Sequence, residues 1–285
     1  MFSSRPPEAK RLELSIRRPT LIGVVHLLPL PGSPRHREPM EGIVERALAD
    51  GRALLAGGMD GVLVENYGDA PFFPERVPPE TVAALAVCAR ELARALPCPV
   101  GVNCLRNDAR AALGIAVAAG ASFIRVNVHT GAYTTDQGIL EGRAHETLRA
   151  RAALASEVKI LADVHVKHAE PIGTEPIGRA ARDAAERGLA DALVVTGPAT
   201  GAPVDLAQLR AVRDAVPDRP VLAGSGVDAA NARSVLSVAD GAIVGSALEE
   251  DGRAGNPVVL ERVRALVSAV REPARGRRPT SPRRS

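Results

Sequence analysis

Aromatic residues and cysteines are scarce in this chain of 285 residues, which has two tyrosines, four phenylalanines and no tryptophan. Proteins that bind single-stranded nucleic acids stack the bases on aromatic side chains, so we expect no nucleic-acid partner. The three cysteines, Cys88, Cys98 and Cys104, cannot form a disulfide framework, and no C-x-x-C pair is present for zinc. We therefore expect a reducing environment and a cytoplasmic protein.

Long apolar runs are also missing. The longest apolar stretch without a charge covers residues 111–124, whereas a membrane-spanning helix needs about 20 apolar residues. The N-terminus has no apolar region of the kind found in secretory signals. The sequence therefore predicts no integral membrane segment.

Charge is distributed unevenly along the chain, although the formal net charge is only +3. Residues 1–18 and 271–285 are basic, and the body between them is acidic. We expect a disordered basic arm over residues 1–18, a single domain over 19–270 and a disordered Arg/Pro/Ser tail over 271–285. The tail could contact phosphate or anionic lipid, which would make the protein peripheral to a membrane.

Short runs rich in Val and Ile alternate with amphipathic helical stretches along the body. The expected strands are 21–26, 61–65, 100–103, 123–128, 160–166, 192–196, 221–223 and 241–244. The expected helices are 41–57, 79–95, 107–119, 139–155, 175–188, 205–215, 228–237 and 257–270. Eight βα units predict an α/β fold, a (β/α)8 TIM barrel of the phosphate-binding type. A doubly wound open sheet is the alternative, but residues 26–32 after the first strand carry no G-x-G-x-x-G fingerprint.

Polar residues stand at the ends of six expected strands, where the active site of such a barrel lies. Because side chains alternate along a strand, Arg125, Asn127 and His129 share one face. Asp163, His165 and Lys167 likewise share a face, and we expect both rows to point to the barrel axis. The catalytic candidates are Glu65, His129, Asp163, His165 and Lys167, and the substrate-binding candidates are His26, Asn66, Asn103, Arg125, Asn127 and Thr196.

Several of these residues have purely structural interpretations. Arg125 and Asp163 could form an ion pair that only stabilises the fold, as could Glu65 and Lys167. His165 could be a core histidine with satisfied hydrogen bonds. No cofactor is predicted, although Glu65, His129, Asp163 and His165 could together bind a divalent metal ion.

Lysine is rare: the chain has 36 basic residues, and Lys10, Lys159 and Lys167 are its only lysines. Arginine is the default cation here, so a lysine in the inward row indicates a need for ammonium chemistry. That chemistry could be imine formation, proton transfer or contact with a point charge. Chance placement of one of three lysines is the alternative.

Two short Gly/Ser turns follow the last two expected strands, where many barrels bind phosphate through backbone N–H groups. The phosphate-binding candidates are Gly224, Ser225, Gly226, Gly245 and Ser246. Two ordinary tight turns are the alternative. The acidic run at residues 249–251 would repel a phosphate if it faced the pocket. The polar, glycine-flanked loop at residues 130–138 could be a lid or a plain connector.

Four blocks of the sequence resemble the BtpA/SgcQ family: GVVHLLPLPGSP at 23–34, DGVLVENYGDAPF at 60–72, FIRVNVHTGA at 123–132 and LADVHVKHA at 161–169. The likeness extends over about residues 20 to 270 and implies a phosphate-type TIM barrel. The family is named after a cyanobacterial factor for photosystem I biogenesis, peripheral to thylakoid membranes. Other members look like uncharacterised enzymes of sugar-related gene clusters. The family pattern has lysines where this chain has Glu249 and Glu250.

Two functions follow as hypotheses. The first is an enzyme that acts on a small phosphorylated metabolite, sugar- or ribose-derived, as a lyase or aldolase, an isomerase or a hydrolase. Glu65 and His165 would be its acid and base. The second is a non-catalytic biogenesis factor of the BtpA type. Under either hypothesis the protein could form homo-oligomers.

Overall fold

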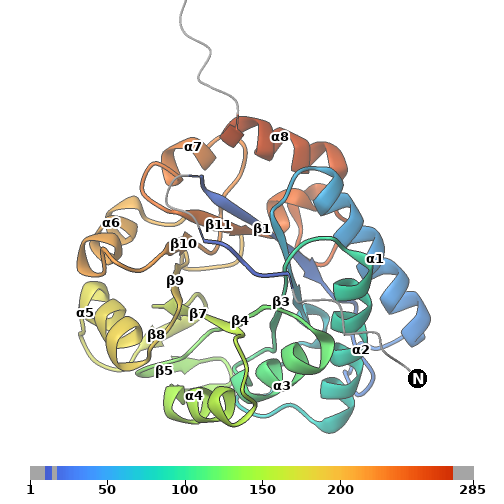
Figure 1. Cartoon of the computed structure of the whole chain (residues 1–285), viewed down its shortest axis with the longest axis horizontal. Coiled ribbons are helices and arrows are strands. Elements are labelled where there is room, and N and C mark those ends of the chain that lie inside the picture. Colours follow the sequence, from blue (N-terminus) through green and yellow to red (C-terminus); the bar gives the residue numbers. More distant parts are fainter. Residues whose placement is uncertain (1–9, 15–17, 272–285) are drawn as a thin grey trace, which may run out of the picture.

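The computed structural model describes residues 10–14 and 18–271. Its centre is a closed barrel of parallel strands in the order β1-β11-β10-β9-β7-β4-β3-β2, which confirms the predicted (β/α)8 barrel (Figure 1). The barrel strands are β1 Thr20–His26, β2 Gly61–Glu65, β3 Val100–Asn103, β4 Phe123–Val126, β7 Lys159–Val164, β9 Ala192–Val195, β10 Val221–Ala223 and β11 Gly241–Val244.

Helices surround the barrel, and each covers the outward face of neighbouring strands (Figure 1). They are α1 Met40–Ala56, α2 Pro79–Ala95, α3 Ala109–Ala119, α4 Ala144–Ala153, α5 Ile177–Arg182, α6 Leu206–Ala215, α7 Ala232–Val235 and α8 Leu260–Arg271. A π-helical turn, Asp183–Arg187, follows α5. Of the helices in the described part of the chain, none combines the length and the apolar character that a membrane crossing requires.

A small antiparallel sheet that the sequence did not predict stands beside the barrel. It consists of β5 Ala132–Thr135, β6 Gly138–Glu141 and β8 Ala169–Pro171, in the order β6-β5-β8. The loop at 130–138 is therefore part of a hairpin, and the helix expected from residue 139 begins at Ala144. Tyr133 and Leu140 are buried and anchor the hairpin on Val128 and Val166.

Barrel strands β4 and β7 end two residues earlier than expected. After β7 the backbone of His165 takes a φ of +50°, in the left-handed region, so the regular alternation of side chains stops there. Other expected strand bounds, such as those of β2 and β3, agree with the structure.

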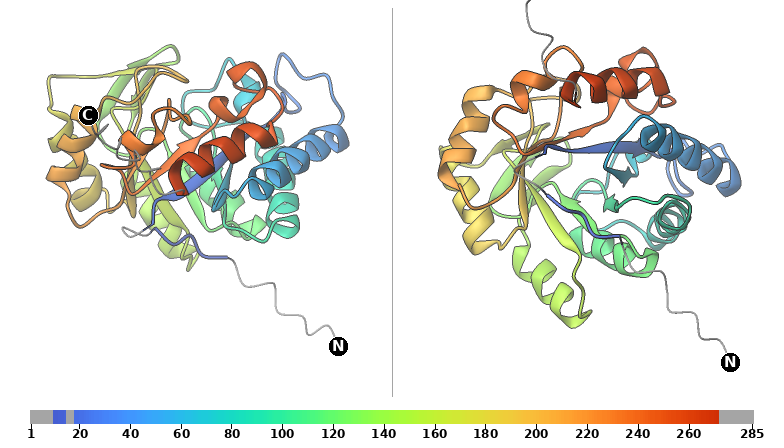
Figure 2. Two further views of the ribbon diagram at one scale, coloured as in Figure 1. Left: turned by 90° about the horizontal axis from the view of Figure 1, so that it is seen from above. Right: turned by 45° about the horizontal axis from the view of Figure 1, so that its top comes forward.

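The barrel interior is a compact apolar cluster that is closed at one end by the N-terminal segment. Phe123, Leu63 and Ile243 belong to this cluster, and so does Leu12, which is 2% exposed. Residues 10–14 lie at the lower side of the barrel in the left view of Figure 2, opposite the loop after β1. The burial of Leu12 does not agree with the disordered arm expected over residues 1–18. Burying this side chain removes apolar surface from water, which favours the packed position. The rest of the arm, residues 1–9 and 15–17, and the expected tail from residue 272 lie outside the described residues.

Candidate active site at the barrel mouth

The inward-facing row of the barrel changes from apolar to polar at the carboxyl ends of the strands. Apolar residues such as Leu63, Phe123 and Leu161 fill the interior. Because side chains alternate, the residues two positions later face the same way. The eight strands contribute to this polar layer in turn: His26, Glu65, Asn103, Arg125, Asp163, Thr196, Gly224 and Gly245. The structure therefore brings these sequence-predicted residues to one end of the barrel.

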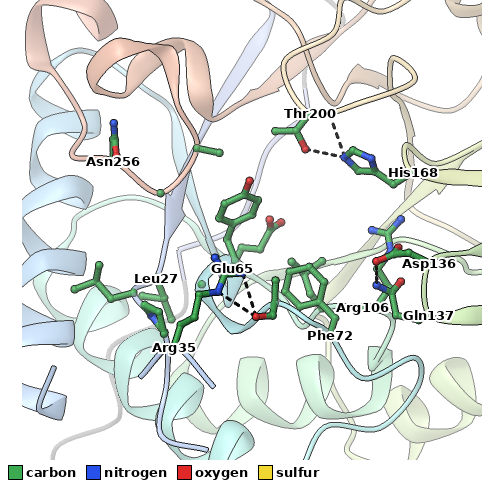
Figure 3. Close-up of a pocket in the computed structure, with 18 residues that line it drawn as sticks. Leu27, Arg35, Glu65, Phe72, Arg106, Asp136, Gln137, His168, Thr200 and Asn256 are labelled. Atoms are coloured by element: carbon green, nitrogen blue, oxygen red, sulfur yellow. Dashed lines mark hydrogen bonds between the residues drawn. The ribbon is translucent and has the colours of Figure 1, made fainter. Parts of the chain in front are cut away.

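A cavity of about 690 Å³ opens above this layer. The loops after β1, β2, β3, β7, β9 and β11 line it, together with the tip of the β5–β6 hairpin. Figure 3 shows Arg106 and Asp136 on one side of the cavity and Asn256 on the other. The labelled lining residues are Leu27, Arg35, Glu65, Phe72, Arg106, Asp136, Gln137, His168, Thr200 and Asn256.

His26 connects two buried carboxylates at this end of the barrel. Its Nδ1 lies 2.5 Å from Oε1 of Glu249, and its Nε2 lies 3.8 Å from Oε1 of Glu65. The β1–β2 register places His26 beside Glu65. The Tyr67 ring packs on the imidazole at 4.6 Å, and burial followed by the charge of Glu65 raises the pKa of the Tyr67 hydroxyl. A carboxylate that fixes one nitrogen of a histidine leaves the other nitrogen to exchange protons.

Glu249 is a site residue that the sequence analysis took only as a source of repulsion for phosphate. Its side chain is 1% exposed, because Oε1 contacts His26 and Oε2 accepts a hydrogen bond of 2.8 Å from the Gly255 N–H. The carboxylate is thus held by these two contacts. No local pattern indicates this, since residues 26 and 249 are far apart in the sequence.

Arg125 and Asp163 form a buried bidentate ion pair, with N–O distances of 2.8 and 2.9 Å. Burial disfavours the charge of Arg125, but Asp163 outweighs this effect and raises the guanidinium pKa. Asn127 donates to Asp163 at 3.3 Å, and Asn103 donates to the Asn127 side chain at 3.0 Å. These contacts make a rigid polar layer across β3, β4 and β7. Gly224 is needed there, because a Cβ on it would lie 2.3 Å from Val194 and 3.3 Å from Arg125.

Arg106 is a second residue that the sequence analysis did not select. It follows β3 directly, is 5% exposed and lines the cavity. Its guanidinium donates to the Lys167 carbonyl at 2.7 Å, and no carboxylate within the described residues lies close enough for an ion pair. Burial lowers its pKa. The sequence offered one signal for this residue, namely a basic residue soon after the end of β3.

Lys167 is held through its backbone at the edge of this site. Its N–H donates to Oγ1 of Thr196 at 2.8 Å, and its carbonyl accepts from Arg106. The side chain is half-buried. Burial, followed by the charge of Arg125, lowers the pKa of its ammonium group.

Of the predicted site residues, only Glu65 lines the 690 Å³ cavity. His129, Asn66 and His165 also have surroundings of their own. His129 is buried and its Nε2 contacts the Gly188 carbonyl at 2.8 Å, while burial lowers its pKa. Asn66 bonds the Leu105 N–H at 2.7 Å and Asp69 at 3.0 Å, which fixes the loop. His165 faces Tyr133, with ring centroids 6.2 Å apart, and lines a separate cavity of about 710 Å³.

The alternative of a divalent metal on Glu65, His129, Asp163 and His165 does not fit this geometry. His129 and His165 point to different surroundings, and Asp163 is occupied by Arg125. Over residues 10–14 and 18–271, no group of three or more His, Cys, Asp or Glu side chains is arranged to hold a metal ion.

The two Gly/Ser turns lie at the same end of the barrel but do not line the 690 Å³ cavity. The Ser225 hydroxyl accepts from the Gly197 N–H at 2.7 Å and donates to the Ala202 carbonyl at 3.2 Å. Gly226 has a φ of +62°, and a Cβ there would lie 2.1 Å from the Ala202 oxygen. The loop after β9 therefore packs directly on this turn. Ser246 begins a short 3-10 helix, Ser246–Leu248, after the second turn.

Comparison with known proteins gives a consistent result. The model of the BtpA family matches residues 17–272. "Photosystem I biogenesis protein BtpA" from Synechocystis sp. is 48% identical over 252 residues, which cover 88% of each chain. An uncharacterised protein from Thermococcus kodakarensis is 48% identical over 259 residues, covering 91% of this chain and 98% of the relative. "Putative sgc region protein SgcQ" from Escherichia coli is 35% identical over 253 residues, covering 88% and 93%.

Solved structures with the same fold are more distant in sequence. Tryptophan synthase from Mycobacterium tuberculosis has a TM-score of 0.60 at 21% identity, covering 90% of this chain and 95% of that chain. Phosphoribosyl anthranilate isomerase from Thermus thermophilus has a TM-score of 0.54 at 15% identity, covering 88% and 97%. At these identities the likeness concerns the fold alone.

Proposed function

The chain belongs to the BtpA family, and from this premise we propose that it is an enzyme for a small phosphorylated ligand. The ligand is sugar- or ribose-derived and binds at the carboxyl end of the barrel. The name of one structural neighbour, a phosphoribosyl anthranilate isomerase, supports this choice of ligand by analogy of fold alone.

The observation that carries the proposal is Arg106. Its guanidinium is almost buried in the cavity wall and, among the described residues, lacks a carboxylate partner. Keeping an unpaired charge away from water is costly unless a ligand neutralises it. A guanidinium is also well suited to bind phosphate or carboxylate oxygens. Arg35 lines the same cavity, and its only hydrogen-bond partner among the described residues is the Ala70 carbonyl, so its charge is also available to an anionic ligand.

The proposed acid–base group is His26, with Glu249 as its positioning residue and Glu65 beside it on the cavity wall. Glu249 fixes Nδ1 of His26, so Nε2 faces Glu65. A proton can then move between the imidazole, Glu65 and a bound ligand. Arg125, Asn103, Asn127 and Thr196 would supply a preorganised polar layer below the ligand. Asp163 would hold Arg125 in place. His129 and His165, chosen from the sequence as catalytic, have no role in this version of the site.

The turns at Gly224, Ser225, Gly226, Gly245 and Ser246 are the proposed phosphate subsite. Their position at the ends of β10 and β11 is the one used by many barrels. The repulsion expected between Glu249 and a phosphate does not argue against this subsite, since the carboxylate is bound by His26 and the Gly255 N–H.

Thermal-shift measurements with ribose 5-phosphate, glycerol 3-phosphate and unphosphorylated ribose test this proposal. A ligand at a hundred times its Kd adds about 2.7 kcal/mol to the stability of the native state. We expect the phosphorylated compounds to raise the Tm of the wild type and ribose to have no effect. Arg106→Gln should abolish the shift, whereas Arg110→Gln, at an exposed position four residues later, should retain it. Equal responses of both variants would contradict the role of Arg106.

A second candidate function rests on the Synechocystis relative, whose name assigns it to photosystem I biogenesis and which is 48% identical. A Synechocystis strain lacking that relative provides the test. A biogenesis factor without catalysis should complement the strain equally well as wild type and as Arg106→Gln. If only the wild type complements, the cavity is required and the enzyme proposal gains support.

A further inference from the structure

We propose that Lys167 forms an imine with the carbonyl carbon of its ligand, which makes the ligand a phosphorylated aldehyde or ketone. This inference rests on the proposed function, because it assigns a substrate class and a covalent step to the same barrel mouth. Four observations support it: the fixed backbone of Lys167, the charges around its side chain, the free carboxylate nearby and the rarity of lysine.

The backbone of Lys167 is fixed from two sides, although the residue lies beyond the end of β7. Thr196 at the end of β9 accepts its N–H at 2.8 Å, and Arg106 from the β3 loop donates to its carbonyl at 2.7 Å. The side chain therefore starts from a defined point at the mouth of the barrel. A nucleophile needs such positioning to meet a ligand in one orientation.

The ammonium group lies in the field of two arginines and two carboxylates, those of Arg125, Arg106, Glu65 and Asp163. It forms no ion pair with any residue that the structure describes. Asp163 is already occupied by Arg125. Burial and the fixed cations therefore favour the neutral amine, and they lower the pKa of Lys167. Only the neutral amine can attack a carbonyl carbon.

The site can also carry the proton that imine formation requires. The neutral amine adds to the carbonyl carbon, its nitrogen gives up two protons, and the former carbonyl oxygen takes up two protons and leaves as water. No oxidant or reductant is needed. Glu65 is suited to this proton transfer, since it lines the cavity and its carboxylate accepts no hydrogen bond from the described residues; Nε2 of His26 lies 3.8 Å from it.

The composition of the chain makes Lys167 easy to distinguish from other amines. Lys10 donates to the Leu96 carbonyl at 2.5 Å, and Lys159 stands at the opposite end of β7. An arginine cannot form a stable imine in this way, and the chain uses arginine for almost all other cations. Lys159, at the start of β7, is therefore an internal control at the other end of the barrel.

The test is reductive trapping of the intact protein at pH 7 with glyceraldehyde 3-phosphate and sodium cyanoborohydride, followed by peptide mass spectrometry. We expect at least tenfold more reduced adduct on Lys167 than on Lys159 or Lys10. Lys167→Arg should remove this adduct, and Lys159→Arg should leave it unchanged. Equal labelling of the three lysines, or no labelling of Lys167, would overturn the inference. Should Lys167→Arg fail to fold, the ratio within the wild type still decides.

A parallel thermal-shift measurement separates this inference from the proposed function. Glycerol 3-phosphate carries a phosphate but no carbonyl group. If it and glyceraldehyde 3-phosphate both raise the Tm while Lys167 stays unlabelled, the imine is wrong and the proposed ligand class stands. If neither compound raises the Tm and labelling is unselective, both ideas are wrong.

Discussion

Breaking the Arg125–Asp163 pair should reveal whether the polar layer across β3, β4 and β7 stabilises the barrel. In Asp163→Asn the guanidinium of Arg125 keeps its charge but loses its bidentate carboxylate, in a place where the two side chains are 2% and 0% exposed. Removing one partner of a buried pair costs about 3–5 kcal/mol. For a chain of this size each kcal/mol lowers the Tm by about 2–4 °C, so we expect a loss of about 6–20 °C.

The double variant Arg125→Met/Asp163→Leu removes both charges and should be more stable than Asp163→Asn, because no unpaired charge remains. Glu75→Gln provides an exposed control: it breaks the Arg143–Glu75 pair, in which the side chains are 41% and 42% exposed. That change should cost much less than Asp163→Asn, because solvent screens an exposed pair. Urea denaturation followed by circular dichroism gives the free energies of unfolding. If Asp163→Asn is as stable as Glu75→Gln, the argument from buried charge is wrong.

Three further predictions concern other parts of the molecule. Leu12→Ala should cost about 2–5 kcal/mol in urea denaturation, since Leu12 is 2% exposed inside the barrel; no loss would mean that the segment does not close the barrel. Glu249→Ala should cost about 1–3 kcal/mol, because His26 loses its partner, while the exposed neighbour Glu250→Ala should stay within about 0.5 kcal/mol. The pKa of His129 is lowered by burial, so its contribution to stability is complete above about pH 6.5 and is lost as the pH falls. His129→Gln should therefore narrow the Tm difference between pH 7 and pH 5, and an unchanged difference would count against this account.

The barrel could be predicted from the sequence because its signals are local. A run such as Gly61–Glu65 is apolar, short and followed by a turn, and its predicted bounds agree with the structure. The small sheet could not be predicted in this way. Thr134 pairs with Glu170 across a long stretch of chain, and neither segment has the apolar pattern of a core strand.

The same distinction applies to the candidate site. Alternation of side chains correctly placed Arg125 and Asp163 on the inner face, because both lie within regular strands. It does not extend to His129 and His165, which lie beyond the ends of β4 and β7. At His165 the backbone also takes a positive φ. Contacts between loops that are distant in the sequence place Arg106 in the cavity wall. Local sequence patterns do not predict such contacts.

The β5–β6 hairpin adds to the cavity wall from outside the barrel strands. Its base is closed by a hydrogen bond of 2.7 Å from the Gly142 N–H to the Gly131 carbonyl, so it leaves and re-enters the barrel at neighbouring points. Its tip, Asp136 and Gln137, reaches the cavity wall. A substitution at this tip therefore changes the lining of the cavity without replacing any residue of the eight barrel strands.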